Sequence, residues 1–196
     1  MTLAQHHSKS EEHFTPVPIV DAVRRLMGWI ELDPASCSRA NEAIQADRIF
    51  TKNFDGLDQI WIANSVFLNP PGGCLRKDET GRWVSTRTGE SGAAVWWSYL
   101  SHQYELGQIK QAFFVGFTLE ILRSAQKAGE YYHRAIPVQN YFRCYPRNRI
   151  AFSGESPTHA NVLVWLPPKG LSRPIEQGLH FASCFMQFGF CEGPAI

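Results

Sequence analysis

The 196-residue chain has little net charge and no long apolar run. Its formal net charge is +1, so no overall field draws it to nucleic acid, and any such binding needs local basic patches. Its apolar runs all fall well short of the ~20 residues that a membrane-spanning helix needs. The sequence therefore predicts a soluble, cytoplasmic protein without a membrane partner.

Cysteines are few and scattered. The five cysteines stand at positions 37, 74, 144, 184 and 191, and no two of them form a CxxC pair. This spacing gives little support to a disulfide framework or a zinc site. We expect reduced thiols, as is usual in a cytoplasmic protein, and no metal site.

Length and composition indicate one domain. A chain of 196 residues that is 44% hydrophobic and 13% aromatic is large enough to bury a substantial core. Residues 1–13 are polar and lack the apolar centre of a signal peptide, so we expect a disordered leader there. We expect residues 14–196 to form a single domain, with a loop or hairpin insertion at about 72–92, where glycine and polar residues are frequent.

Apolar periodicity predicts helices that alternate with strands. The expected helices cover residues 19–29, 38–46, 93–106, 119–128 and 173–187. The expected strands cover residues 29–32, 66–68 and 109–118, followed by a closing hairpin made of 149–152 and 161–166. This order predicts an α/β fold with a mostly parallel sheet and an antiparallel C-terminal hairpin.

The apolar run at 66–68 ends abruptly in Asn69-Pro70-Pro71. Proline lacks an N–H for strand pairing and restricts the residue before it, so the strand must stop here. Open α/β sheets bind their ligands at the carboxyl ends of strands. The Asn69 side-chain oxygen and the Pro70 carbonyl are two rigid, uncharged acceptors that suit the two hydrogens of an exocyclic amine. The alternative is a turn that merely terminates the strand.

Other short motifs stand around this turn in a definite order. They are Phe14-Thr15-Pro16, Leu32-Asp33-Pro34-Ala35, Phe50-Thr51, Asp55-Gly56-Leu57, Trp61, Phe67-Leu68-Asn69-Pro70-Pro71, Asn148-Arg149-Ile150-Ala151-Phe152 and Val162-Leu163-Val164-Trp165. Together they resemble the phage-type, Dam-like DNA N6-adenine methyltransferases over roughly residues 14–167. The resemblance implies a Rossmann-like methyltransferase sheet that binds S-adenosyl-L-methionine (SAM).

The resemblance also implies cofactor-binding roles. Asp33, with Pro34 and Ala35, would lie at the SAM site, and the segment 14–16 would pack beside the methionine end. A carboxylate there suits the ammonium and sulfonium of SAM, since opposite charges attract more strongly away from water. Asp55 would lie near the cofactor adenine. Each residue has a structural alternative: a turn or helix cap for Asp33, a turn for Asp55 and an N-cap for Thr15.

By the same resemblance, Asn69, Pro70 and Pro71 form the catalytic turn. Two acceptors placed outside the adenine plane would favour a pyramidal nitrogen and free its lone pair to attack the sulfonium methyl group. Such catalysis works through orientation and electrostatics, without a covalent enzyme intermediate. A target adenine in double-stranded DNA would first be flipped out, at a cost of a few kcal/mol.

Gly72 departs from the family pattern, which has an aromatic residue at this position. A ring there would stack on the flipped base, and such stacking is worth about 1–3 kcal/mol. Three interpretations remain open. A ring can come from elsewhere, with Trp83, Trp96 and Trp97 as candidates; the substrate can differ from adenine in DNA; or the site can bind cofactor with little methylation.

Two basic segments are candidate nucleic-acid contacts. Arginine forks suit phosphates, and aromatic faces suit unstacked bases. The residues concerned are Arg76, Lys77 and Arg82 in the insertion, and Arg134, Arg143, Arg147 and Arg149 among the aromatics of 131–149. Alternatively, the insertion covers the pocket, the aromatics of the second segment belong to the core and its arginines form a solvated rim.

The sequence thus predicts a phage or prophage enzyme that acts in the host cytoplasm and methylates adenine N6 in DNA. Two alternatives stand beside this prediction. One is a catalytically divergent SAM-fold protein that binds nucleic acid. The other is an amino-methyltransferase that acts on a modified base, RNA or a protein glutamine.

Overall fold

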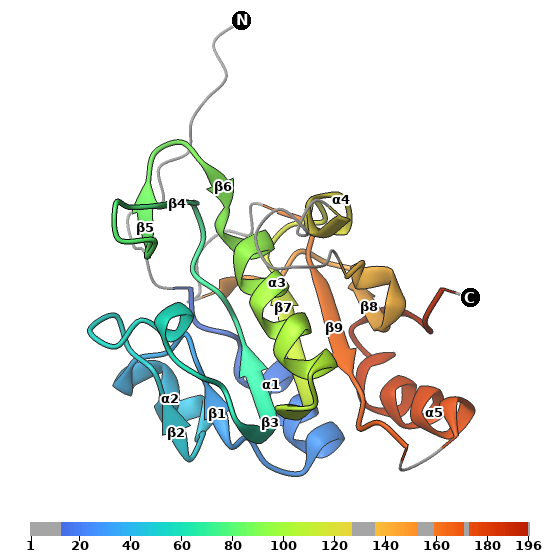
Figure 1. The fold of residues 1–196 in the computed structure, drawn as a ribbon. Helices are drawn as coiled ribbons and strands as arrows, with labels where there is room; N and C mark the ends of the chain where they lie inside the picture. Colours follow the sequence, from blue (N-terminus) through green and yellow to red (C-terminus); the bar gives the residue numbers. More distant parts are fainter. Residues whose placement is uncertain (1–12, 127–135, 153–158, 171–172, 196) are drawn as a thin grey trace, which may run out of the picture.

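The computed structural model describes residues 13–126, 136–152, 159–170 and 173–195, so nearly all of the expected leader lies outside the described residues (Figure 1). A seven-stranded sheet runs through the domain in the order β10-β8-β9-β7-β3-β1-β2. Its strands are β1 Leu32–Asp33, β2 Arg48–Ile49, β3 Ala63–Leu68, β7 Ile109–Gly116, β8 Phe142–Pro146, β9 Val162–Leu166 and β10 Gly189–Glu192.

The strand directions confirm a mixed α/β fold with a mostly parallel sheet. The pairs β1/β2, β1/β3 and β3/β7 are parallel. Strand β9 is antiparallel to both β7 and β8, so β8 runs in the same direction as β7. Strand β10 is antiparallel to β8 and forms one edge of the sheet.

Helices cover both faces of the sheet. The helices are α1 Val17–Met27, α2 Ser38–Ile44, α3 Gly92–Glu105, α4 Ile121–Ser124 and α5 Pro174–Phe185. Helix α3 packs on one face, and α1 and α5 pack together on the other, so the apolar core is divided into two clusters (Figure 1). None of these described helices has the length and apolar character that crossing a membrane requires.

Helix α1 shows how the sequence sets its own boundaries. A proline stands in its first turn, where a missing N–H costs little, and the helix ends at Gly28 with φ of 85°. Its buried residues, Ile19, Val20, Ala22, Val23, Leu26 and Met27, recur at helical spacing and face the sheet. The end of α1 leads the chain directly into β1.

The expected closing hairpin had the wrong first strand. Residues 149–152 form no strand, because the Ile150 N–H is bound by the Asn161 side chain (2.8 Å) rather than by a neighbouring strand. Strand β9 pairs instead with β7 and with β8, and β8 ends at Pro146. Strand β10 follows α5 and was not predicted.

The region of the expected insertion forms a small sheet of its own. Strands β4 Cys74–Lys77, β5 Trp83–Thr86 and β6 Glu90–Ser91 pair antiparallel in the order β5-β4-β6. The two ends of the insertion meet where the Gly92 N–H donates to Gly73 O at 2.9 Å. Because Gly92 begins α3, this small sheet stands directly between the Asn69-Pro70-Pro71 turn and that helix.

Candidate functional site

Successive strands are added on opposite sides of β1. From β1 the chain moves outward to β2 and then returns to the other side of β1 as β3. Such a switch point leaves a crevice at the carboxyl ends of the two strands, where α/β proteins bind ligands. Leu32 is in register with Val66, so Asp33 and Asn69 end neighbouring strands at this edge. We call the segments that follow β1 and β3 here the switch-point rim.

Asn69 is held by the segment that precedes α1. Its Nδ2 donates a hydrogen bond to the His13 carbonyl at 2.7 Å. This bond orients the amide and leaves Oδ1 as an acceptor. Pro70 is buried, whereas Pro71 is exposed. The His13 contact could not be predicted from the sequence, because the two residues are 56 positions apart and a backbone carbonyl carries no sequence signature.

His13 is itself fixed by aromatic packing. Its ring lies 5.2 Å from that of Phe117, which follows β7, and 6.5 Å from that of Phe152. The next residue, Phe14, packs under the Arg39 guanidinium at 5.3 Å. The segment 13–16 therefore contacts residues that follow β3 and β7, beside the catalytic turn expected from the sequence.

Thr15 is a buried polar residue at the same place. Its hydroxyl has no hydrogen-bond partner among the described residues, although the side chain is only 6% exposed. The N-cap of α1 is Pro16 rather than Thr15, so the structure does not show the expected capping role. A buried hydroxyl without a partner is costly unless a ligand or water satisfies it.

Asp33 carries a buried carboxyl group. It is 3% exposed and forms no ion pair with any described residue, and its Oδ1 accepts a hydrogen bond from the Ala35 N–H at 3.1 Å. Burial raises the pKa of Asp33 to about 7, and the Ala35 hydrogen bond offsets only part of this effect. Asp33 therefore performs the turn role, and its buried carboxyl group has a raised pKa.

The loop that holds Asp55 touches the segment after β1 through Gly56. A Cβ atom on Gly56 would lie 2.1 Å from Pro34 O, so only glycine allows the two loops to touch. The Asp55 Oδ1 accepts from the Leu57 N–H at 3.0 Å and caps a short 3₁₀ turn, Gly56–Asp58. Asp55 thus performs the turn role, in a loop that contacts Pro34 through Gly56.

Gly72 is exposed, and a Cβ atom built there would meet nothing within 4 Å. The tryptophans that were candidates to replace its ring are buried instead: Trp83 is 9% exposed, Trp96 4% and Trp97 0%. Trp96 stacks on Trp61 with ring centroids 6.0 Å apart, and Trp97 packs against Phe114 at 5.2 Å. None of the three offers an exposed ring to an incoming base in this structure.

The basic residues of the second segment differ in their exposure to solvent. Arg143 is buried, pairs with Glu192 at 2.6 Å and donates to three backbone carbonyls, so it has a structural role. Arg147 and Arg149 are exposed, and Arg134 lies outside the described residues. The solvated-rim alternative fits these two exposed arginines, and the core alternative fits the buried Tyr141.

In the insertion, two of the three basic residues have intramolecular partners. Arg82 pairs with Asp58 at 2.5 Å, and Lys77 lies over the Trp83 ring at 5.3 Å. Arg76 is exposed on β4. The insertion, which follows the Asn69-Pro70-Pro71 turn in the chain, thus exposes Arg76 close in sequence to the exposed Asp78 and Glu79.

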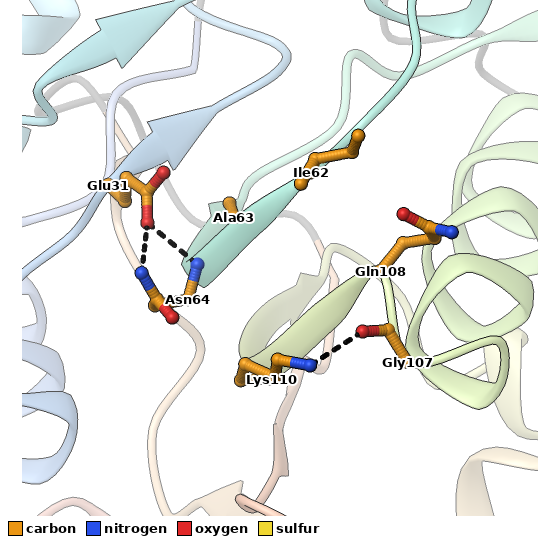
Figure 2. Close-up of a pocket in the computed structure, with 7 residues that line it drawn as sticks. All are labelled: Glu31, Ile62, Ala63, Asn64, Gly107, Gln108 and Lys110. Carbon is orange, nitrogen blue, oxygen red and sulfur yellow. Dashed lines mark hydrogen bonds between the residues drawn. The ribbon is translucent and has the colours of Figure 1, made fainter.

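Two surface depressions lie away from the switch-point rim. Figure 2 shows one of them, at the amino ends of β3 and β7; its volume is about 260 Å³. There Glu31 accepts from both the backbone and side-chain nitrogens of Asn64, at 2.7 and 2.9 Å. The other, of about 370 Å³, lies between α1, α5 and β9 and is lined by Leu26, Trp165 and His180, among others. Neither includes a residue expected to bind cofactor or target.

Within the described residues no three His, Cys, Asp or Glu side chains gather closely enough to hold a metal ion. The structure therefore places Asn69 against the segment 13–16 and Asp33 on the neighbouring strand, and it buries Arg143 while Arg76, Arg147 and Arg149 are exposed. No protein-family model, no curated protein and no solved structure matches this chain significantly, so its function must be inferred from the chemistry of this rim.

Proposed function

We propose that this protein is a SAM-dependent DNA adenine-N6 methyltransferase of the phage type. The observation that carries the proposal is that a buried carboxyl group, which pairs with no cation among the described residues, and an oriented amide oxygen stand at one switch point. Asp33 and Asn69 supply these groups from the ends of β1 and β3. A mostly parallel sheet closed by antiparallel strands agrees with the fold that the sequence resemblance implies.

The residues present fit the cofactor. SAM supplies an electrophilic methyl group on a sulfonium centre. Asp33 would hold a positive charge of the cofactor, since its buried carboxyl has no cation among the described residues. The Thr15 hydroxyl would gain the hydrogen-bond partner that it lacks. Asp55 would accept from the adenine amino group with the oxygen that does not cap the turn.

The target amine would bind between two acceptors. Asn69 Oδ1 and the Pro70 carbonyl would accept the two hydrogens of adenine N6, and the His13 carbonyl would keep the Asn69 amide from rotating. Preorganised acceptors of this kind stabilise charge as it develops on the nitrogen without reorganising during the reaction. The exposed residues Arg76, Arg147 and Arg149 would contact DNA phosphates.

The test is to incubate the purified protein with unmethylated DNA and SAM carrying a deuterated methyl group. Mass spectrometry of the digested nucleosides is expected to show deuterated N6-methyladenine. Parallel reactions with RNA and with a protein extract would locate the label if the acceptor is of another class. Label in RNA or protein alone would contradict the DNA assignment, and label in no acceptor would contradict the methyltransferase proposal.

Gly72 favours one alternative, a SAM-fold protein that binds nucleic acid without methylating it. The exposed glycine leaves the catalytic turn without a ring to stack on a flipped base. This alternative predicts salt-dependent DNA binding and SAM binding by calorimetry, with no methyl transfer to any acceptor. The labelling experiment above distinguishes the two functions directly.

Restoring the ring at position 72 gives a further prediction. Gly72→Tyr is expected to raise kcat/KM for DNA methylation by roughly 5- to 150-fold, the equivalent of ~1–3 kcal/mol of base stacking. The side chain fits, because its Cβ would meet no neighbour within 4 Å. Initial rates on a fixed DNA substrate measure the effect.

Gly72→Leu is the matched control, since it adds apolar bulk without an aromatic face. We expect it to leave kcat/KM within a few-fold of the wild type. Equal rates for the tyrosine and leucine variants would show that the missing ring does not limit this enzyme.

A further inference from the structure

Two of the five cysteines face each other across neighbouring strands. Cys144 lies on β8 and Cys191 on the edge strand β10, and they are direct register partners in this antiparallel pair. Both thiols are unpaired with other cysteines; Cys144 is buried and Cys191 is half-buried. Side chains that lie directly opposite in a sheet point to the same face, so the two sulfur atoms share one side of it.

Hydrogen-bonded and non-hydrogen-bonded residue pairs alternate along the two strands, and this alternation shows which kind of pair the two cysteines form. The Arg147 N–H donates to Phe188 O at 2.9 Å, and these two residues continue the same register, which makes them a hydrogen-bonded pair. Such pairs alternate with non-hydrogen-bonded ones along an antiparallel ladder. The next pair contains Pro146, which has no N–H, and two further steps bring the chain to Cys144 and Cys191.

Cys144 and Cys191 are therefore a non-hydrogen-bonded pair, the closer of the two kinds. Cα atoms in such pairs are about 4.5 Å apart. Disulfides span Cα separations of about 4.4–6.8 Å, so a bond can form here without moving the strands apart. We propose that Cys144 and Cys191 are an oxidisable dithiol site that closes into a cross-strand disulfide when it meets a disulfide oxidant such as oxidised glutathione.

The two thiols have different roles in this exchange. The neighbouring Cys144 thiol lowers the pKa of Cys191, because an S–H donor stabilises a thiolate, and Cys191 is also the more exposed. Cys191 attacks one sulfur of the oxidant, and the first glutathione leaves as a thiolate. Cys144 then loses its proton and attacks the Cys191 sulfur, and the second glutathione leaves. Two protons and two electrons pass from the protein to the oxidant.

The disulfide would fix the edge of the sheet. Glu192, next to Cys191, holds the buried Arg143 guanidinium and also accepts from the Tyr145 hydroxyl at 2.8 Å. Tying β10 to β8 keeps this carboxylate over the arginine. The bond would also close a long loop of chain, which is expected to raise Tm by roughly 5–15 °C.

The test compares the reduced full-length protein with the protein incubated with oxidised glutathione at low concentration. Iodoacetamide blocks the remaining thiols after denaturation, and digestion with mass spectrometry maps the products. A Cys184→Ser background removes ambiguity, because no basic residue separates positions 184 and 191 for tryptic cleavage. We expect a peptide linking Cys144 to Cys191 and a higher Tm, both reversed by a reducing agent.

Cys191→Ser and Cys144→Ser variants serve as controls, with Cys37→Ser as a variant outside the pair. The first two are expected to show no linked peptide and no oxidant-dependent rise in Tm, and Cys37→Ser is expected to behave as the wild type. A stable glutathione adduct on Cys191 without the link, a link to a different cysteine, or full alkylation of both thiols would overturn the proposal.

Discussion

Asn69→Ala is expected to lower kcat for adenine methylation by about 10²–10³-fold, with little change in the affinity for SAM. The substitution removes one of the two acceptors that would hold the target amine, and losses of this size are typical when a preorganised group of this kind is deleted. Nucleoside mass spectrometry over a time course measures kcat, and calorimetry measures SAM binding. An unchanged rate would exclude Asn69 from catalysis.

The matched variants are Asn69→Asp and Asn53→Ala. A carboxylate still accepts hydrogen bonds, but it cannot donate to the His13 carbonyl as the Asn69 amide does at 2.7 Å. Asn69→Asp is therefore expected to retain only part of the activity, because repulsion between two oxygens turns the side chain away. Asn53 is exposed in a turn before Asp55, and its substitution is expected to leave the rate unchanged.

Asp33→Asn is expected to stabilise the protein above pH 7 and to weaken SAM binding. Burial raises the pKa of Asp33 to about 7, whereas the unfolded chain keeps the ordinary value of 3.8. Between about pH 4 and 7 the folded state retains a proton that the unfolded state has lost, so stability falls as pH rises. The total loss is about 4 kcal/mol at most, and asparagine, which does not ionise, avoids it.

Urea unfolding at intervals from pH 4 to 8 measures this effect. The wild type is expected to lose stability across that window, and the variant to have a flatter profile. The exposed Asp47→Asn serves as the control and is expected to follow the wild type. A wild-type profile that does not fall between pH 4 and 7 would contradict the raised pKa.

The same substitution tests the cofactor site. A bound cation favours the ionised carboxyl, so wild-type affinity for SAM is expected to increase from pH 5 to 8. Asp33→Asn is expected to bind SAM about 10- to 150-fold more weakly at pH 8, the range for losing a hydrogen bond to a charged group. Equal affinities would remove Asp33 from the cofactor site while leaving the stability result intact.

The sequence predicted the elements whose signals are local. Pro70 and Pro71 ended β3, Gly28 ended α1, and the apolar run at 109–118 became β7. These predictions worked because proline, glycine and a buried apolar run act on the backbone at their own positions. The adjacency of Asp33 and Asn69 followed once both were placed at the carboxyl ends of parallel strands.

Contacts between residues far apart in the chain could not be predicted from the sequence. Arg143 looked like a phosphate ligand among aromatics, but a carboxylate 49 residues later covers it. The same segment, 142–146, is strand β8, whose first three residues are all buried, so no alternation of apolar and polar residues marked it as a strand. The His13 carbonyl that orients Asn69 could not be predicted, since every residue has a carbonyl and only the tertiary fold selects one.

The hydrogen bond between Gly92 N–H and Gly73 O closes the β4–β6 segment at its base. Its entry and exit are already joined by one backbone hydrogen bond of 2.9 Å, so the closure entropy of a longer or shorter segment changes little. The exposed residues 78–81 at its tip can therefore vary while the Asn69-Pro70-Pro71 turn on one side and α3 on the other keep their places, provided that the buried Trp83 is retained. The exposed surface of the small sheet can thus change without rebuilding the core.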